Sequence, residues 1–176
     1  MHTKGTYSVW LIPGKPYLGE LTTIIQSLAT AYASFTFLPH VSIYRIKNIG
    51  LRDFVTTVSP CIAHLSAIPV RFGKLEFSSI VNKTLYMPIL HSPQLKKLHN
   101  DLSLAFHNFD PLPYDPHVSI LYKRKMSDSD KETESKKVVV PNECVLTKCV
   151  IMQSVTSLTA GSDSPQWDIV HEQLLY

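Results

Sequence analysis

The sequence predicts an α+β fold made of two similar halves within one domain of 176 residues. The first observation is a repeat: Pro-His-Val-Ser-Ile occurs at residues 39–43 and again at 116–120, an offset of 77 residues. The second is that strand-like and helix-like patterns follow one another in the same order before each copy. The third is an apolar content of 44%, which is enough for one full hydrophobic core. We therefore expect residues 1–176 to form a single domain with two pseudo-symmetric lobes.

Each half opens with a predicted strand. Residues 7–12 combine alternation with β-branched and aromatic side chains, and residues 84–89 stand at the offset of 77 with a similar pattern. The two copies of the repeated string lead into the second strand of each half, over residues 41–46 and 118–122. Each half therefore contributes two strands to the sheet structure.

A helix is predicted between the two strands of each half. Apolar residues recur there at three- and four-residue steps, which places them on one helix face. Pro16 and Pro93 stand just upstream, where the start of a helix tolerates proline. The recurring residues are Leu18, Leu21, Ile25 and Leu28 in the first half and Leu95, Leu98, Leu102 and Ala105 in the second.

The segment that connects the halves predicts one helix and one strand. Residues 51–65 have a helical pattern but contain Pro60, so we expect this helix to be kinked or shorter than its pattern. Residues 68–77 predict a strand that leads into the second half.

After the second copy of the repeat, the chain is first charged and then apolar. Residues 123–143 contain six basic and five acidic side chains, which predicts a surface loop or a short exposed helix. Apolar segments return at residues 144–157 and 167–175, and we expect two strands there that complete the sheet structure.

Charge and cysteine content narrow the function classes. The net charge of +3 is mild and evenly spread, so charge alone does not indicate a protein that binds duplex DNA, and a small anionic ligand fits it just as well. No apolar run approaches the roughly 18 residues of a membrane span, so we expect a cytoplasmic protein without signal peptide or membrane contact. The three cysteines have no metal-binding spacing, and we expect reduced structural thiols.

The repeated string carries two His-x-Ser motifs. On a strand, residues two apart project from the same face, so His40 and Ser42 share one face while Val41 between them packs into the core. The same holds for His117 and Ser119. If a two-fold axis relates the lobes, the two pairs face one another across a shared cleft.

Two imidazoles and two hydroxyls suit the hydrolysis of a phosphodiester without a metal. Displacement at phosphorus needs a base for the entering water and an acid for the leaving oxygen. Histidines with a pKa of about 6.5 can share these roles at neutral pH. The serine hydroxyls can hold the non-bridging phosphate oxygens between them.

With one His-x-Ser motif in each lobe of a duplicated fold, the chain resembles the two-histidine (2H) phosphoesterase superfamily. The N-terminal TYSVWLIP and the proline before each histidine are most similar to its cyclic phosphodiesterase branch. The resemblance implies two antiparallel sheets that line a central cleft, with helices packed outside. It also implies hydrolysis of ADP-ribose 1″,2″-cyclic phosphate to ADP-ribose 1″-phosphate and of nucleoside 2′,3′-cyclic phosphates to 2′-phosphates.

The resemblance also implies roles for individual residues. His40 and His117 would be the acid and base, with a preference for His117 as the group that activates water. Ser42 and Ser119 would bind the phosphate. Trp10 and Tyr122 match aromatic positions that line the cleft in relatives, although a core position is an equal alternative for Trp10. Tyr86, which aligns with Val9 at the offset, would add a third wall.

Partners and alternatives follow from the same motifs. We expect a monomer that acts on a small cyclic-phosphate nucleotide, with no cofactor and no metal. The alternatives are a phosphodiesterase of the same superfamily that acts on RNA ends or 2′,5′-linked oligonucleotides in RNA processing, and a nucleotide- or RNA-binding module without turnover. Four basic residues follow the motif strands and either attract an anionic substrate or are ordinary solvent-facing charges; they are Arg45, Lys47, Lys123 and Arg124.

Overall fold

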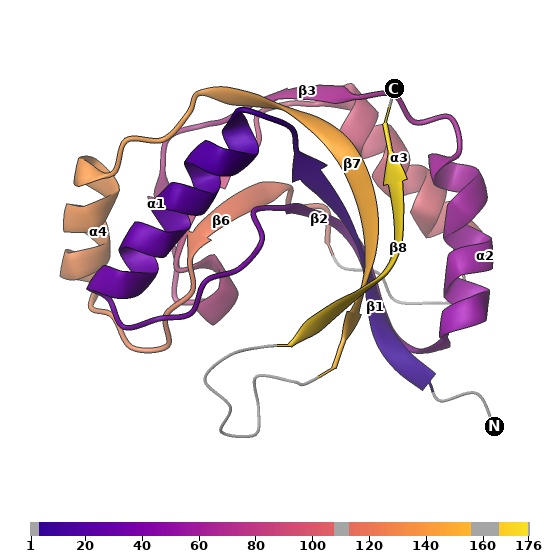
Figure 1. Ribbon diagram of the computed structural model, residues 1–176, viewed down its shortest axis with the longest axis horizontal. Coiled ribbons are helices and arrows are strands. Elements are labelled where there is room, and N and C mark those ends of the chain that lie inside the picture. Colours follow the sequence, from indigo (N-terminus) through magenta and orange to yellow (C-terminus); the bar gives the residue numbers. More distant parts are fainter. Residues whose placement is uncertain (1–3, 108–112, 156–165, 176) are drawn as a thin grey trace.

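The computed structural model describes residues 4–107, 113–155 and 166–175 and confirms the predicted α+β fold (Figure 1). Within these residues, eight strands form one antiparallel sheet in the order β3-β7-β1-β2-β6-β5-β4, with β8 also paired to β7. Five strands belong to the first lobe: β1 (Lys4–Pro13), β2 (Val41–Gly50), β3 (Ile68–Arg71), β7 (Glu143–Ser154) and β8 (Trp167–Leu174). Three belong to the second: β4 (Glu76–Phe77), β5 (Leu85–Pro88) and β6 (His117–Leu121).

The strands of the two lobes are joined through a single pair of residues. β2 and β6 are antiparallel neighbours, and Val41 and Val118 are the residues paired between them. This contact joins the two sheets that the resemblance implied into one continuous sheet. Because Val118 is also the repeat counterpart of Val41, the local two-fold axis of the antiparallel pair passes between the two valines.

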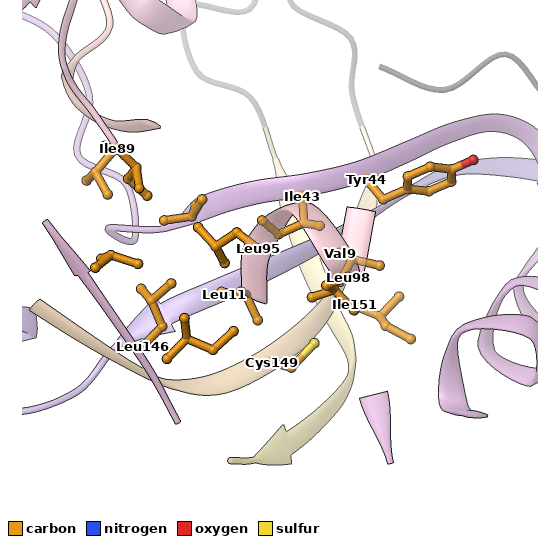
Figure 2. Close-up of a cluster of buried hydrophobic side chains, with 14 of the residues drawn as sticks. Val9, Leu11, Ile43, Tyr44, Ile89, Leu95, Leu98, Leu146, Cys149 and Ile151 are labelled. Carbon is orange, nitrogen blue, oxygen red and sulfur yellow. The ribbon is translucent and has the colours of Figure 1, made fainter. Parts of the chain in front are cut away.

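The repeat helices pack on the strands of the opposite half. Helix α1 (Tyr17–Ala31) contacts β6, and α3 (Pro93–Ala105) contacts β2. Both predicted helices are confirmed, and six of the eight apolar positions named above are buried, such as Leu21 and Leu98. Leu18 is only half-buried, and Ala105, in the last turn of α3, is exposed. Figure 2 shows Leu95 and Leu98 of α3 among core residues of the first lobe. This exchange of helices holds the two lobes together through one core.

The connecting segment differs in part from its prediction. Helix α2 (Leu51–Ile62) contains Pro60 but ends two residues after it, so the proline disturbs only the last turn. Residues 68–77 do not form one strand: β3 pairs with β7 of the first lobe, whereas β4 pairs with β5 of the second. The chain crosses between lobes near Gly73, where a Cβ atom would lie 3.0 Å from the side chain of Pro88. Such close approach favours glycine and interrupts the predicted strand.

The charged segment after β6 contains a short exposed helix, α4 (Asp128–Lys137), which was one of the two structures predicted for it. It contacts α1 through the hydroxyl of Tyr32, which donates to Glu134 Oε2 at 2.7 Å. The C-terminal strands are confirmed as β7 and β8, with residues 156 and 157 outside the described residues. None of the helices in the described part of the chain is long and apolar enough to cross a membrane.

Candidate active site

The two His-x-Ser motifs lie side by side at the junction of the lobes. Val41 and Val118 are fully buried and point to the core face of the sheet. In an antiparallel pair, the neighbours on either side of this central pair share the opposite face. His40 therefore lies across from Ser119, and Ser42 lies across from His117. The structure thus brings together all four side chains of the predicted motifs.

Both histidine rings are held by the same backbone contact. His40 Nδ1 lies 2.7 Å from the carbonyl oxygen of Leu38, and His117 Nδ1 lies 2.7 Å from that of Asp115. A carbonyl oxygen can only accept, so each Nδ1 carries the hydrogen and donates it. The second ring nitrogen, Nε2, is therefore the one left with a lone pair in the neutral form. Each imidazole is prepared to exchange a proton through Nε2.

An aromatic ring from the preceding strand contacts each histidine. Trp10 is opposite Ser42 in the strand register and stacks on His40, with ring centroids 3.5 Å apart and planes inclined by 9°. Tyr86 is opposite Ser119 and meets His117 edge-on, with centroids 5.4 Å apart. Tyr86 is therefore the structural counterpart of Trp10. Its alignment with Val9 at the offset of 77 is wrong by one residue, because the turn before the helix is one residue longer in the second half: Pro16 follows Trp10 by six residues, and Pro93 follows Tyr86 by seven.

Trp10 and Tyr122 are more deeply buried than cleft walls would be. Trp10 is 4% exposed and packs with Ile12 and Trp167, so it belongs to an apolar cluster as well as to the site. Tyr122 is also 4% exposed and stacks on Phe37, with centroids 3.8 Å apart. Burial raises the pKa of the Tyr122 phenol, and a hydrogen bond with the Ser119 side chain partly offsets this rise. Its ring therefore lies in the core and does not form a wall of a cleft.

The two serines differ in their surroundings. The hydroxyl of Ser119 donates to the carbonyl oxygen of Asn82 at 2.8 Å, within the short 3-10 helix η1 (Val81–Lys83). This bond fixes the position of the hydroxyl and places η1 against the second motif. Ser42 is half-buried beside Trp10.

Burial lowers the pKa of both histidines. The pKa of His40 falls to about 4, chiefly because the ring is buried; the Leu38 carbonyl raises it, and the charge of His117 lowers it further. The pKa of His117 is also lowered, first by burial and then by Lys83, while the carbonyl and the carboxylate of Asp115 raise it. In the unliganded protein both rings are therefore held toward the neutral form at neutral pH.

Charged residues that the motifs did not reveal surround His117. Lys83 Nζ lies 2.5 Å from Asp115 Oδ2 and 4.0 Å from the centroid of the Tyr86 ring. Asp115 Oδ2 is also 3.7 Å from His117 Nδ1. The hydroxyl of Tyr86 donates to Glu76 Oε2 at 2.6 Å; burial and Glu76 together raise its pKa to about 12. Of these charged residues, only Asp115 is close to the second motif in the sequence, two residues before His117. Lys83 and Glu76 are distant in the sequence, and the fold brings them to the site.

The basic residues that follow the motif strands have different environments. Lys123 Nζ donates to the carbonyl oxygens of Tyr32 and Ala33, so it closes the end of α1 instead of facing a ligand. Arg45 lies on β2, beyond Ser42. Within the described residues, no group of three or more His, Cys, Asp or Glu side chains is arranged to hold a metal ion.

Comparisons with known proteins identify a family and a distant relative of the chain. The model of the 2′-5′ RNA ligase superfamily matches residues 39–156, which include both motifs. A cyclic phosphodiesterase from Arabidopsis thaliana is 18% identical over 133 residues, which cover 76% of this chain and 74% of that protein.

Solved structures show the same fold at low sequence identity. The protein TT0787 of Thermus thermophilus superposes with a TM-score of 0.68 at 10% identity and covers 97% of each chain. Escherichia coli LigT in complex with 3′-AMP has a TM-score of 0.66 at 10% identity, over 98% of this chain and 99% of that chain. The likeness extends over nearly the whole molecule, so both lobes belong to the shared fold.

Proposed function

The chain belongs to the 2′-5′ RNA ligase superfamily, and on this premise we propose that it hydrolyses the cyclic phosphodiesters of small nucleotides. One observation carries the proposal: Val41 and Val118 pair across the lobes, so that two imidazoles and two hydroxyls share one face of the sheet. The identical carbonyl contacts of both Nδ1 atoms support it, because they leave both Nε2 atoms for proton transfer. The match to the family model confirms the family prediction that was made from the two motifs.

The proposed reaction is an in-line displacement at phosphorus. One neutral imidazole takes a proton from water as the oxygen of that water forms a bond to phosphorus. The opposite imidazolium gives its proton to the leaving ribose oxygen as the second P–O bond breaks. Hydroxyl groups at Ser42 and Ser119 donate to the non-bridging oxygens, for which the Ser119 hydroxyl turns from the Asn82 carbonyl. The product is a phosphomonoester, and the two histidines exchange protonation states.

We assign the base to His40 and the acid to His117, the reverse of the order preferred from the sequence. Burial and the apolar contact with Trp10 hold His40 neutral, with a pKa of about 4. His117 is more exposed and lies 3.7 Å from the carboxylate of Asp115. A bound phosphate anion raises the pKa of both rings, and the ring beside a carboxylate takes up the proton more readily.

The proposed substrates are ADP-ribose 1″,2″-cyclic phosphate, opened to ADP-ribose 1″-phosphate, and nucleoside 2′,3′-cyclic phosphates, opened to 2′-phosphates. The similarity to a cyclic phosphodiesterase supports this substrate class. The compact arrangement of motif residues around one point also supports it, because a five-membered cyclic phosphate presents a single small reacting group.

The test is turnover of these substrates in the presence of a chelator, with identification of the phosphomonoester product. We expect His40→Ala and His117→Ala each to lower turnover by at least about 100-fold, while His64→Ala, at an exposed position beyond α2, leaves it unchanged. Full activity of either motif variant, or a strict need for a divalent ion, would contradict the mechanism. Turnover confined to oligonucleotides with cyclic ends would favour an RNA substrate, and binding without turnover would favour a binding module.

A further inference from the structure

Arg45 lies on the same face of the sheet as the two motifs. The register of β1 and β2 pairs Trp10 with Ser42 and Ser8 with Arg45. Ser8 and Trp10 are two residues apart on β1 and share one face, so Arg45 shares that face with Ser42, roughly 7 Å along the sheet. The three-residue spacing on β2 fits because the register shifts between Val9 and Trp10, which leaves one extra residue on β2.

The half-buried side chain of Arg45 has a buried nitrogen without an acceptor. Its Nε atom is buried and has no hydrogen-bond partner. Among the described residues, no carboxylate lies within ion-pair distance of Arg45. Its neighbours in the same row of the sheet, Ser8 and Met152, carry no charge. A buried donor without a partner is unfavourable until an acceptor binds.

Other lysines near the site already have acceptors. Lys83 is paired with Asp115, Lys123 with backbone carbonyls, and Lys148 with Glu172. Arg45 therefore differs from them in offering an unused cationic donor on the face that carries the motifs. Its planar guanidinium has the geometry that binds two oxygens of one phosphate group.

We propose that Arg45 binds a second phosphate of the substrate, namely the one on the 5′ oxygen of the ribose that carries the cyclic phosphate. The inference rests on the proposed function, since the cyclic phosphate must occupy the two motifs. A 5′-linked phosphate occurs both in the diphosphate bridge of ADP-ribose 1″,2″-cyclic phosphate and in the last linkage of an oligonucleotide with a 2′,3′-cyclic end. Arg45 thus favours substrates that carry a phosphate on the 5′ oxygen over nucleoside cyclic phosphates with a free 5′ hydroxyl.

Kinetics with matched substrates test this selection. Wild-type protein should hydrolyse adenosine 2′,3′-cyclic phosphate that bears a 5′-phosphate with a kcat/KM about 10- to 100-fold above that of the same compound without it. Arg45→Met should remove this preference and change the kcat/KM of the unphosphorylated compound by less than about twofold. Arg45→Lys should restore part of the preference, because charge remains while the planar fork is lost. Arg52→Met, at an exposed arginine of α2, is the matched control and should behave as wild type.

Two further substrates identify the source of the phosphate. ADP-ribose 1″,2″-cyclic phosphate and a dinucleotide with a 2′,3′-cyclic end should both lose activity in Arg45→Met if the subsite reads any 5′-linked phosphate. A loss for only one of them assigns the subsite to that substrate. An equal loss for substrates with and without the 5′-phosphate, or no preference in the wild type, would overturn the proposal.

A binding measurement separates failure of this inference from failure of the proposed function. Adenosine 2′,5′-bisphosphate should bind wild-type protein about 10- to 100-fold more tightly than adenosine 2′-phosphate, and Arg45→Met should equalise the two affinities. This result without any turnover would uphold the subsite and reject the hydrolytic function. Equal affinities in the wild type, together with normal turnover, would reject the subsite and uphold the hydrolytic function.

Discussion

His40 and His117 occupy equivalent positions in the two lobes but lie in different surroundings. His40 is 7% exposed and is covered by the stacked ring of Trp10. His117 has a side chain that is 21% exposed and lies among an edge-on tyrosine, a carboxylate and an ammonium group. One half of the site is therefore apolar, and the other is charged.

The comparison separates what the backbone determines from what the side chains determine. In both rings the Nδ1–H group donates to the carbonyl oxygen two residues earlier in the chain, with the same Nδ1-to-oxygen distance of 2.7 Å. That carbonyl exists whatever side chain its residue carries, so orientation survives the change from Leu38 to Asp115. Proton affinity does depend on the side chain, because a carboxylate stabilises the imidazolium and a buried apolar contact does not. A duplicated motif can thus keep its geometry while its two histidines acquire different roles.

The largest expected effect is the loss of either imidazole. Each of His40→Ala and His117→Ala should lower kcat for a nucleoside 2′,3′-cyclic phosphate by about 10²- to 10⁴-fold, the usual contribution of general acid–base catalysis. The double variant should be no slower than the worse single variant, because acid and base act as a unit. Single-turnover rates in the presence of a chelator measure this, and multiplicative losses would show that the two residues act independently.

Local alternation predicted the faces of the two motifs, but it failed where a strand is irregular. Strict alternation from Ser42 would place Tyr44 with the motif and Arg45 in the core; the register shift in β2 reverses this order. The ungapped offset failed at Tyr86 for a related reason, because the turn from Tyr86 to Pro93 is one residue longer than the turn from Trp10 to Pro16. A single extra residue leaves no pattern in one sequence, because the side-chain period on each side of it is unchanged.

Contacts between distant segments also could not be predicted from the sequence. The exchange of α1 and α3 between lobes depends on how the helices pack, not on the periodicity that predicted them. Lys83 reaches Asp115 only because the Asn82 carbonyl binds Ser119 and fixes η1 against the second motif. The motif histidines were predictable because the repeat is visible in the sequence. The charged neighbours of His117 in the second lobe have no charged counterpart in the first lobe, so the repeat gave no indication of them.

The next largest effect concerns the aromatic residues. Trp10→Ala should lower the free energy of unfolding by about 3–5 kcal/mol, because a large buried side chain is removed from an apolar cluster. It should also raise the pKa of His40, since the stacked ring keeps water from that imidazole. Urea unfolding and the NMR titration of the histidine ring protons measure the two effects.

Tyr86→Phe is the comparison in the other lobe. It removes only the hydrogen bond to Glu76 and should cost about 0.5–1.5 kcal/mol of stability. The His40 titration should stay unchanged in this variant. An unchanged pKa of His40 in Trp10→Ala would show that burial by Trp10 is not the cause of the difference in proton affinity between His40 and His117.

A smaller effect is the dependence of stability on pH that His40 contributes. The unfolded chain binds a proton at this residue near pH 6.5, whereas the folded protein does so only near pH 4. Protonation therefore favours unfolding, and stability falls as the pH is lowered from about 6.5 to about 4, by about 3 kcal/mol in total. His40→Asn should remove this part of the slope in urea unfolding measured across that range. An unchanged slope in His40→Asn would mean that His40 is not held neutral in the fold.

The smallest effect tests the charged half alone, through opposite changes at Lys83 and Asp115. Lys83→Met removes a cation that lowers the pKa of His117, so the pKa of that histidine should rise. Asp115→Asn removes a carboxylate that raises it, so the pKa should fall. With His117 as the acid, the basic limb of the kcat/KM profile should follow its pKa, upward in the first variant and downward in the second. Lys136→Met, in an exposed ion pair of α4, should move neither limb. The assignment of His117 as the acid and His40 as the base would be contradicted if the basic limb shifted in the same direction in both variants. A shift of the acidic limb, which His40 sets, would also contradict it.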